Sequence, residues 1–228
     1  MIEFRGKLIL LDIEGTVSPM AFVHEVMFPY ARERAYAWLE AHWGHAAISR
    51  LAQDTGANSF ANAPEAGAAL LRLMDADAKV AGLKQIQGLI WEEGFHSGDL
   101  RSPLFDEVSP TLRRWREQGL EIRIYSSGSI HAQRLFFSNT VEGDLTPLFS
   151  GYYDTTTGSK KEAASYHAIA ADCGLAPEEI FFISDLTDEL DAARNAGMLT
   201  GLALRPGNQP QTPSHHPKIT TFGDITFP

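Results

Sequence analysis

The chain has 228 residues, of which 44% are hydrophobic and 21% charged, and its formal net charge is -10. This composition is typical of a globular protein and excludes a disordered chain, and the negative charge argues against nucleic acid or a membrane as partner. The single cysteine, Cys173, excludes an internal disulfide and a cysteine-rich zinc site, which agrees with the cytoplasmic localisation that we expect.

The first predicted element is a strand, "LILL" at residues 8–11, which shows no polar alternation and is therefore expected to be buried on both faces. Its apolar run is too short for a signal peptide or a membrane span. The strand ends in Asp12, and Glu14 and Thr16 follow closely. Two carboxylates and a hydroxyl at the end of a buried strand call for an explanation.

The sequence pattern of residues 19–105 predicts helices joined by small loops, and we expect no strand among them. Pro29 should kink or divide the long aromatic helix that begins this segment. Because a crossover between parallel strands needs only a dozen or more residues, so long a segment indicates an inserted domain. We predict an α/β core made of residues 1–18 and 106–228, with an all-helical domain of residues 19–105 inserted after the first strand.

From residue 106 onward, strand-like and helix-like segments alternate. We expect a helix with Ser109 as N-cap, a strand at 120–125, and a helix that ends at Gly174. A second buried strand at 180–184 is followed by a helix that stops at Gly197 and a last short strand near 199–205, after which the tail should be irregular. This order predicts a Rossmann-like parallel sheet with crossover helices.

Four groups of polar residues stand at the ends of these strands or at helix starts. They are Asp12 with Glu14 and Thr16, the loop Ser126, Ser127 and Gly128, the pair Lys160 and Lys161, and Asp185 with Thr187, Asp188 and Glu189 beyond it. The carboxyl ends of parallel strands form the crevice where such sheets bind ligands. We therefore expect these groups to meet at one edge, with Lys161 a surface residue.

These residue types suit phosphoryl transfer. A carboxylate can act as nucleophile, and Mg²⁺ held by carboxylates reduces its repulsion from a phosphate. A lysine and serine hydroxyls suit the phosphate oxygens, and a second carboxyl can protonate the leaving oxygen. Each group alone is common in ordinary turns and caps, so the prediction depends on finding all four in order.

The four motifs "DIEGT", "YSSGS", "GSK" and "ISD" resemble, in order, those of the haloacid dehalogenase-like hydrolases. That superfamily usually has a second aspartate where this chain has Glu14. This departure and the stretches "SPMAFVHEVMFPYA", "IYSSGSIHAQRLFFSNTVEGDL" and "LRPGN" resemble the enolase-phosphatase family of methionine salvage, the acireductone synthases. The resemblance runs from about residue 7 to residue 208.

The resemblance implies a bifunctional enzyme that enolises and then dephosphorylates 2,3-diketo-5-methylthiopentyl-1-phosphate. It implies one Mg²⁺ per chain, held at Asp12, Glu14 (through its backbone carbonyl) and Asp185. Asp12 would be the nucleophile and Glu14 the acid/base, and Ser126, Ser127 and Lys160 would bind substrate and phosphate. The family further suggests a monomer, with the helical insertion as a cap over the site.

Two other functions remain open on the residues alone. One is a generic Mg²⁺-dependent sugar-phosphate phosphatase with a helical cap. The other is a non-catalytic regulatory module on the same fold, which would not need an acid for the leaving group. The base of the enolisation is also open, with Glu14, His24 and Glu25 as candidates.

Overall fold

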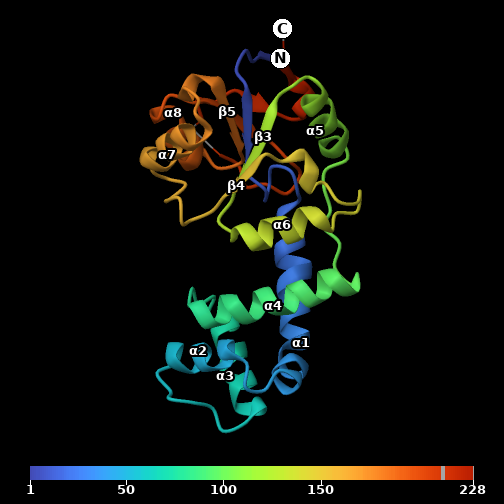
Figure 1. Cartoon of the computed structure of the whole chain (residues 1–228), viewed down its shortest axis with the longest axis vertical. Helices are drawn as coiled ribbons and strands as arrows, with labels where there is room; N and C mark the ends of the chain where they lie inside the picture. The colour runs from blue at the N-terminus through green and yellow to red at the C-terminus, as the bar shows by residue number, and fades with distance from the viewer. Residues whose placement is uncertain (212–213, 228) are drawn as a thin grey trace. The chain divides into compact units, whose positions relative to one another are not determined.

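The computed structural model describes residues 1–211 and 214–227, and the chain forms two compact units (Figure 1). One unit joins Met1–Ala21 to Arg101–Pro228, and the other is the continuous segment Phe22–Leu100. The domain boundaries inferred from the sequence stay a prediction, as does the role of the second unit as a cap.

The first unit contains a six-stranded sheet in the order β4-β3-β2-β5-β6-β7, and every neighbouring pair is parallel. The strands are β4 (Gly151–Tyr153), β3 (Glu121–Tyr125), β2 (Leu8–Leu11), β5 (Ile180–Ser184), β6 (Leu199–Ala203) and β7 (Lys218–Ile219). All residues of β2 and β5 are buried. The predicted parallel α/β sheet, with two strands covered on both faces, is confirmed.

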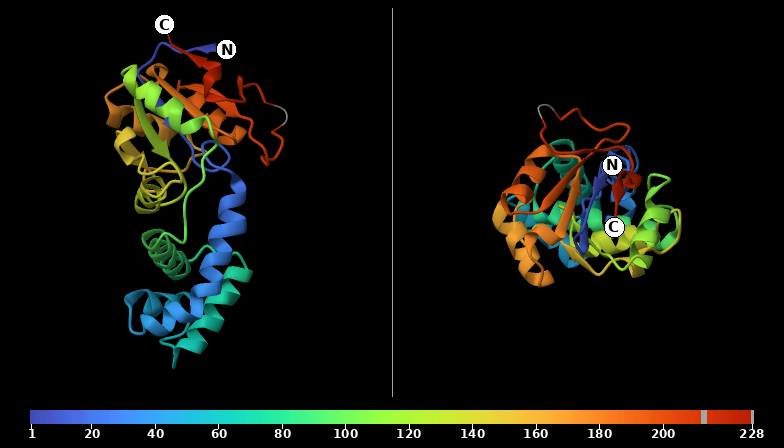
Figure 2. Two further views of the ribbon diagram at one scale, coloured as in Figure 1. Left: turned by 90° about the vertical axis from the view of Figure 1, so that its right-hand side faces the viewer. Right: turned by 90° about the horizontal axis from the view of Figure 1, so that it is seen from above.

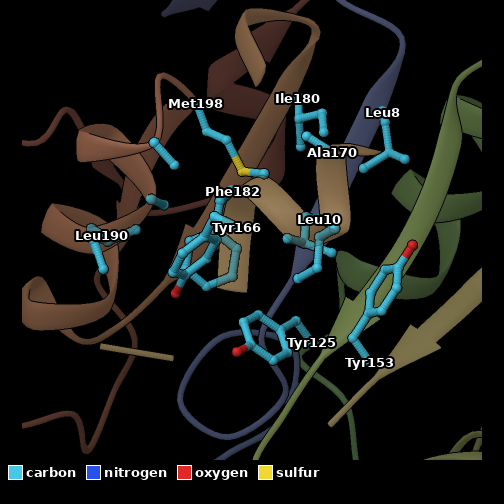
Figure 3. Close-up of a cluster of buried hydrophobic side chains, with 14 of the residues drawn as sticks. Leu8, Leu10, Tyr125, Tyr153, Tyr166, Ala170, Ile180, Phe182, Leu190 and Met198 are labelled. Carbon is cyan, nitrogen blue, oxygen red and sulfur yellow. The ribbon is translucent and has the colours of Figure 1, made fainter. Parts of the chain in front are cut away.

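Helices cover the two faces of this sheet. Helices α7 (Ala163–Cys173) and α8 (Thr187–Asn195) pack on the face that presents Leu8, Leu10 and Phe182, and Figure 3 shows the resulting cluster. Helix α5 (Val108–Glu117) lies on the other side of the sheet, as both views in Figure 2 show. Helix α6 (Ile130–Ser138) follows β3. Alternate residues of each central strand therefore face two separate layers of helix.

Two expectations about this unit are wrong in detail. Helix α5 begins two residues earlier than expected, with Glu107 at the N-cap in place of Ser109, and Ser109 is buried inside its first turn. Pro110 is tolerated there because the first N–H groups of a helix have no intrahelical partner. The Glu107 side chain forms no capping hydrogen bond with the helix, and its carboxylate instead accepts from Phe222 N at 3.2 Å.

The tail is also more regular than expected. Residues beyond Arg205 form β7, a short 3-10 helix (Phe222–Asp224) and β8 (Ile225–Thr226). Strand β8 pairs in parallel with β1 (Ile2–Glu3), so the two ends of the chain lie side by side (Figure 2). The positions 212 and 213 of the predicted irregular tail lie outside the described residues. Backbone pairing with β6 and β1 therefore overrides the Pro- and Gln-rich composition.

The second unit is helical, and all of its residues are described. It contains a π-helix (Phe22–Met27) and the helices α1 (Phe28–Ala41), α2 (Ala46–Asp54), α3 (Ala63–Asp75) and α4 (Ala81–Ser97). Pro29 stands in the first turn of α1, where the π-helix gives way to the α-helix, so the expected division is confirmed. Side chains such as Trp38, Leu51 and Ile86 form a core of its own.

Candidate active site

The register of the sheet brings the predicted groups to one edge. Leu11 of β2 is paired with Ile124 of β3 and Ile183 of β5. Asp12, which follows Leu11, therefore lies level with the carboxyl ends of both neighbouring strands, and its N–H donates to Ile183 O at 3.0 Å. Asp12, Ser126 and Asp185 follow the ends of these three strands, and all three are buried.

A buried lysine connects two carboxylates at this edge. Lys160 Nζ donates to Asp12 Oδ1 at 2.6 Å and lies 2.6 Å from Glu189 Oε2. Glu189 also accepts from Ser184 Oγ at 2.9 Å. Although burial opposes it, the charges of Asp12 and Glu189 raise the pKa of Lys160, so this ammonium stays protonated. The lysine thus holds one oxygen of Asp12 in a fixed position.

Negative charge exceeds positive charge here. Asp12, Asp185 and Glu189 are three buried carboxyl groups beside the one ammonium of Lys160. Burial and the charges of Asp12 and Glu189 raise the pKa of Asp185 to about 7, and burial followed by Asp12 raises that of Glu189. A divalent cation at this edge would relieve the repulsion.

The residues present fit Mg²⁺, which usually binds one or two carboxylates together with waters and ligand oxygens. Asp12 and Asp185 supply such carboxylates. The described residues hold no ready cluster of three or more His, Cys, Asp or Glu side chains, so a closed all-protein cage is not what this edge offers. Near Asp185, the buried amide oxygen of Asn208 has no hydrogen-bond partner in the described chain, which leaves a further oxygen for a cation or its waters.

The loop that carries Glu14 is held closely against Asp185. Gly15 has φ +68°, and a Cβ there would lie 2.5 Å from Asp185 Oδ2. Only glycine allows this backbone conformation together with so close an approach. Glu14 itself is half-buried and its backbone forms a bridge with Ser18.

Two tyrosines from the core hold the loop that carries Lys160. Tyr166 Oη donates to Lys160 O at 2.7 Å, and Tyr125 Oη donates to Gly158 O at 3.0 Å. Both rings belong to the cluster of Figure 3, where they lie edge to face with centroids 5.5 Å apart. The hydrophobic core therefore fixes the position of the Lys160 backbone at the edge of the sheet.

The remaining predicted residues have different surroundings. Ser126 is buried and its Oγ accepts from Gly128 N at 3.3 Å, whereas Ser127 is exposed in the same loop. Lys161 is exposed and pairs with Asp188 at 2.9 Å, as expected of a surface residue. His24 and Glu25 lie exposed in the π-helix of the helical unit.

Sequence reasoning gave no role to Glu189, Tyr166 and Asn208. The spacing of Glu189 could have identified it, because it stands one helical turn after Asp185 at the start of α8. Tyr166 looked like an ordinary core residue of an amphipathic helix. Asn208 ends the stretch "LRPGN", which contributed to the family resemblance, but it received no role because the composition of the tail predicted no structure.

The fold and the buried carboxylate–lysine arrangement define a haloacid dehalogenase-like hydrolase. A model of the haloacid dehalogenase-like hydrolase family matches residues 7–197. A solved structure, the UTR4 protein of Saccharomyces cerevisiae, superposes with a TM-score of 0.84 at 34% identity, covering 96% of this chain and 100% of that one.

Curated relatives narrow the family further. Enolase-phosphatase E1 of Aquifex aeolicus is 44% identical over 96% of this chain and 98% of its own length. The protein of the same name from Methylococcus capsulatus is 45% identical over 96% and 97%. The chain belongs to the enolase-phosphatase E1 family, and the predicted resemblance and enzyme class are confirmed.

Proposed function

We propose that this chain is the bifunctional enolase-phosphatase of methionine salvage. It converts 2,3-diketo-5-methylthiopentyl-1-phosphate to 1,2-dihydroxy-3-keto-5-methylthiopentene and phosphate. The buried contact between Lys160 and Asp12 carries the phosphatase half, since it presents a carboxylate beside a fixed positive charge. The relatives named Enolase-phosphatase E1 support the choice of reaction over a generic sugar-phosphate phosphatase.

In the phosphatase half, an oxygen of Asp12 attacks phosphorus while the bond from phosphorus to the ester oxygen breaks. Lys160 holds Oδ1 at 2.6 Å, which leaves Oδ2 as the attacking atom. Glu14 gives its proton to the departing enol oxygen, and water then cleaves the acyl phosphate on Asp12, which releases phosphate. Ser126, Ser127 and Lys160 bind the phosphate oxygens.

Asp12, Asp185 and the backbone carbonyl of Glu14 would hold one Mg²⁺ per chain, which when bound would supply electrostatic stabilisation of the phosphate and polarisation of the substrate carbonyl. In the enolase half a base removes the proton from the carbon that bears the phosphate ester oxygen. Glu14, His24 and Glu25 stay candidates for that base.

The enzyme acts as a cytoplasmic monomer, and the helical unit serves as its cap. None of the helices in the described chain is both long and apolar enough to span a membrane.

A direct assay separates this function from its alternatives. The diketone phosphate is compared with simple sugar phosphates, and the enol absorbance and phosphate release are followed together. We expect the diketone phosphate to be strongly preferred and the absorbance to rise before phosphate appears. Equal turnover of sugar phosphates would favour the generic phosphatase, and no Mg²⁺-dependent release from any phosphate ester would favour a regulatory module.

The covalent step has its own test. Borohydride reduces an acyl phosphate, so treatment during turnover should modify Asp12, as peptide mass spectrometry would show. The variant Asp12→Asn should give no modified peptide and no phosphate. If Asp12 stays unmodified in the active enzyme, attack by water in place of Asp12 is the better description.

A further inference from the structure

The segment after β6 reaches back to the loop that follows Asp12. Asn208 Nδ2 donates to Gly15 O at 2.8 Å and to Ala203 O at 3.3 Å. Both partners are carbonyl oxygens, which only accept hydrogen bonds, so the amide nitrogen must face them. The amide oxygen of Asn208 therefore faces the other way.

That oxygen is buried and has no hydrogen-bond partner within the described ranges. A Cβ placed on Gly15 would lie 2.9 Å from Asn208 Oδ1 and 2.5 Å from Asp185 Oδ2. Two acceptor oxygens thus converge on one side of Gly15. Because a buried amide oxygen is costly to leave unpaired, this arrangement calls for a donor or a cation beside it.

The segment is firmly anchored, so the position of Asn208 is not that of a loose surface loop. Arg205 Nε donates to Thr16 O at 3.0 Å, and Nη1 lies 2.6 Å from Glu107 Oε1. The guanidinium also lies over the rings of Phe105 and Phe222, at 4.8 Å and 4.9 Å from their centroids. Together, Arg205 and Asn208 bind two successive carbonyls of the Asp12 loop.

We propose that Asn208 is a positioning residue of the magnesium site. Its amide nitrogen holds the Gly15 carbonyl and thereby the backbone of the loop that follows Asp12 and lies against Asp185. Its amide oxygen accepts a hydrogen bond from a water of the ion's hydration shell. The inference rests on the proposed function, because it requires Mg²⁺ at Asp12 and Asp185. Groups that orient the ligands of a metal typically change its affinity by about 10–100-fold when they are removed.

Isothermal titration with Mg²⁺ alone tests the proposal without reference to activity. We expect Asn208→Ala to weaken Mg²⁺ binding by about 10–100-fold. The matched control is Gln209→Ala, which alters an exposed neighbour in the same segment and should bind Mg²⁺ like the unmodified protein. Thermal melting in EDTA shows whether each variant is folded.

A second variant distinguishes proximity to the ion from a merely structural role. Asn208→Asp places a carboxylate beside Asp185 and the Gly15 carbonyl, so it should lower Tm in EDTA and gain more from Mg²⁺ than the unmodified protein does. The Mg²⁺-induced rise in Tm should increase from Asn208→Ala through the unmodified protein to Asn208→Asp.

The outcomes separate the two proposals. If the unmodified protein binds Mg²⁺ and both Asn208 variants bind it equally well, Asn208 has only a structural role. The inference is then overturned while the proposed function stands. If the unmodified protein does not bind Mg²⁺, the proposed function and the inference fail together. Should Asn208→Ala not fold in EDTA, the response of Asn208→Asp decides.

Discussion

At the scale of single residues, Lys160 is the one buried positive charge among Asp12, Asp185 and Glu189. An ion pair of this kind contributes little net stability by itself, but removing one partner leaves the others uncompensated. The consequences of its loss should therefore be larger than those of any surface lysine.

We expect Lys160→Met to abolish turnover and to lower the free energy of unfolding by about 3–5 kcal/mol near pH 7. A carboxyl whose pKa is higher in the folded than in the unfolded state favours folding at low pH and loses that contribution as pH rises. The variant should therefore regain stability when the pH falls from about 8 to about 5. Urea titrations across this range measure the effect. Lys161→Met, at the exposed neighbour, is the control and should show neither change.

Proton transfer by Glu14 can be tested separately from the roles of its neighbours. A general acid contributes about 10²–10⁴-fold when the leaving oxygen needs a proton, and much less when it does not. Glu14→Ala should therefore lose about that factor in kcat on an alkyl phosphate ester and far less on p-nitrophenyl phosphate. Steady-state kinetics on both substrates compare the two losses. Equal losses would show that Glu14 places the substrate or the metal ion and transfers no proton.

At the scale of elements, the loop between β2 and the rest of the core depends on Gly15. Gly15→Ala would force an alanine to φ +68° and bring its Cβ to 2.5 Å from Asp185 Oδ2. Gly119 offers a matched control, because it has φ +84° but open space around its Cα. Both substitutions should cost about 1–2 kcal/mol of stability for the left-handed backbone. Only Gly15→Ala should also lose Mg²⁺ affinity and activity, as calorimetric titration and phosphate release would show.

The elements themselves were largely predictable from the sequence, for physical reasons that differ between them. Strands β2 and β5 have no polar alternation, and the helices that end at Gly174 and Gly197 carry a clear stop signal. The strands β7 and β8 could not be predicted, since each has only two residues and owes its conformation to pairing with β6 and β1.

The site was predictable only in part. Motif order could indicate Asp12, Lys160 and Asp185, because strand ends of a parallel sheet converge. The contribution of Tyr166, whose hydroxyl holds the Lys160 carbonyl, depends on helix packing that no local pattern reveals. The contribution of Asn208 is even harder to predict from the sequence, since its contact with Gly15 joins residues far apart in the chain.

At the scale of the whole molecule, the two units have separate hydrophobic cores, and the acidic groups of the proposed metal site all belong to the first unit. Binding of Mg²⁺ alone should therefore stabilise the first unit directly. We expect hydrogen exchange to slow at residues 12–16 and 184–189 when Mg²⁺ is added, with little change in the core helices of residues 22–100. Mass spectrometry of peptides from both units measures this, and equal slowing in both would show that the metal orders the entire chain.

Stability, pH and Mg²⁺ should be linked through Asp185. Its pKa is raised to about 7, first by burial and then by Asp12 and Glu189, so its protonated form favours the folded state in EDTA. That contribution is complete below the ordinary carboxyl pKa of about 4 and is lost as pH rises through about 7.

Mg²⁺ has the opposite preference, because it binds the ionised carboxylate. The rise in Tm that Mg²⁺ produces should therefore grow from about pH 6 to about pH 8, while in EDTA the stability attributable to this carboxyl falls over the same range. Asp185→Asn should remove both dependences, and Asp188→Asn, at an exposed acid in the first turn of α8, should keep them. Melting curves of the three proteins with EDTA and with Mg²⁺ measure the linkage. An equal Mg²⁺-induced shift at both pH values in the unmodified protein would mean that Asp185 does not bind the ion in competition with protons.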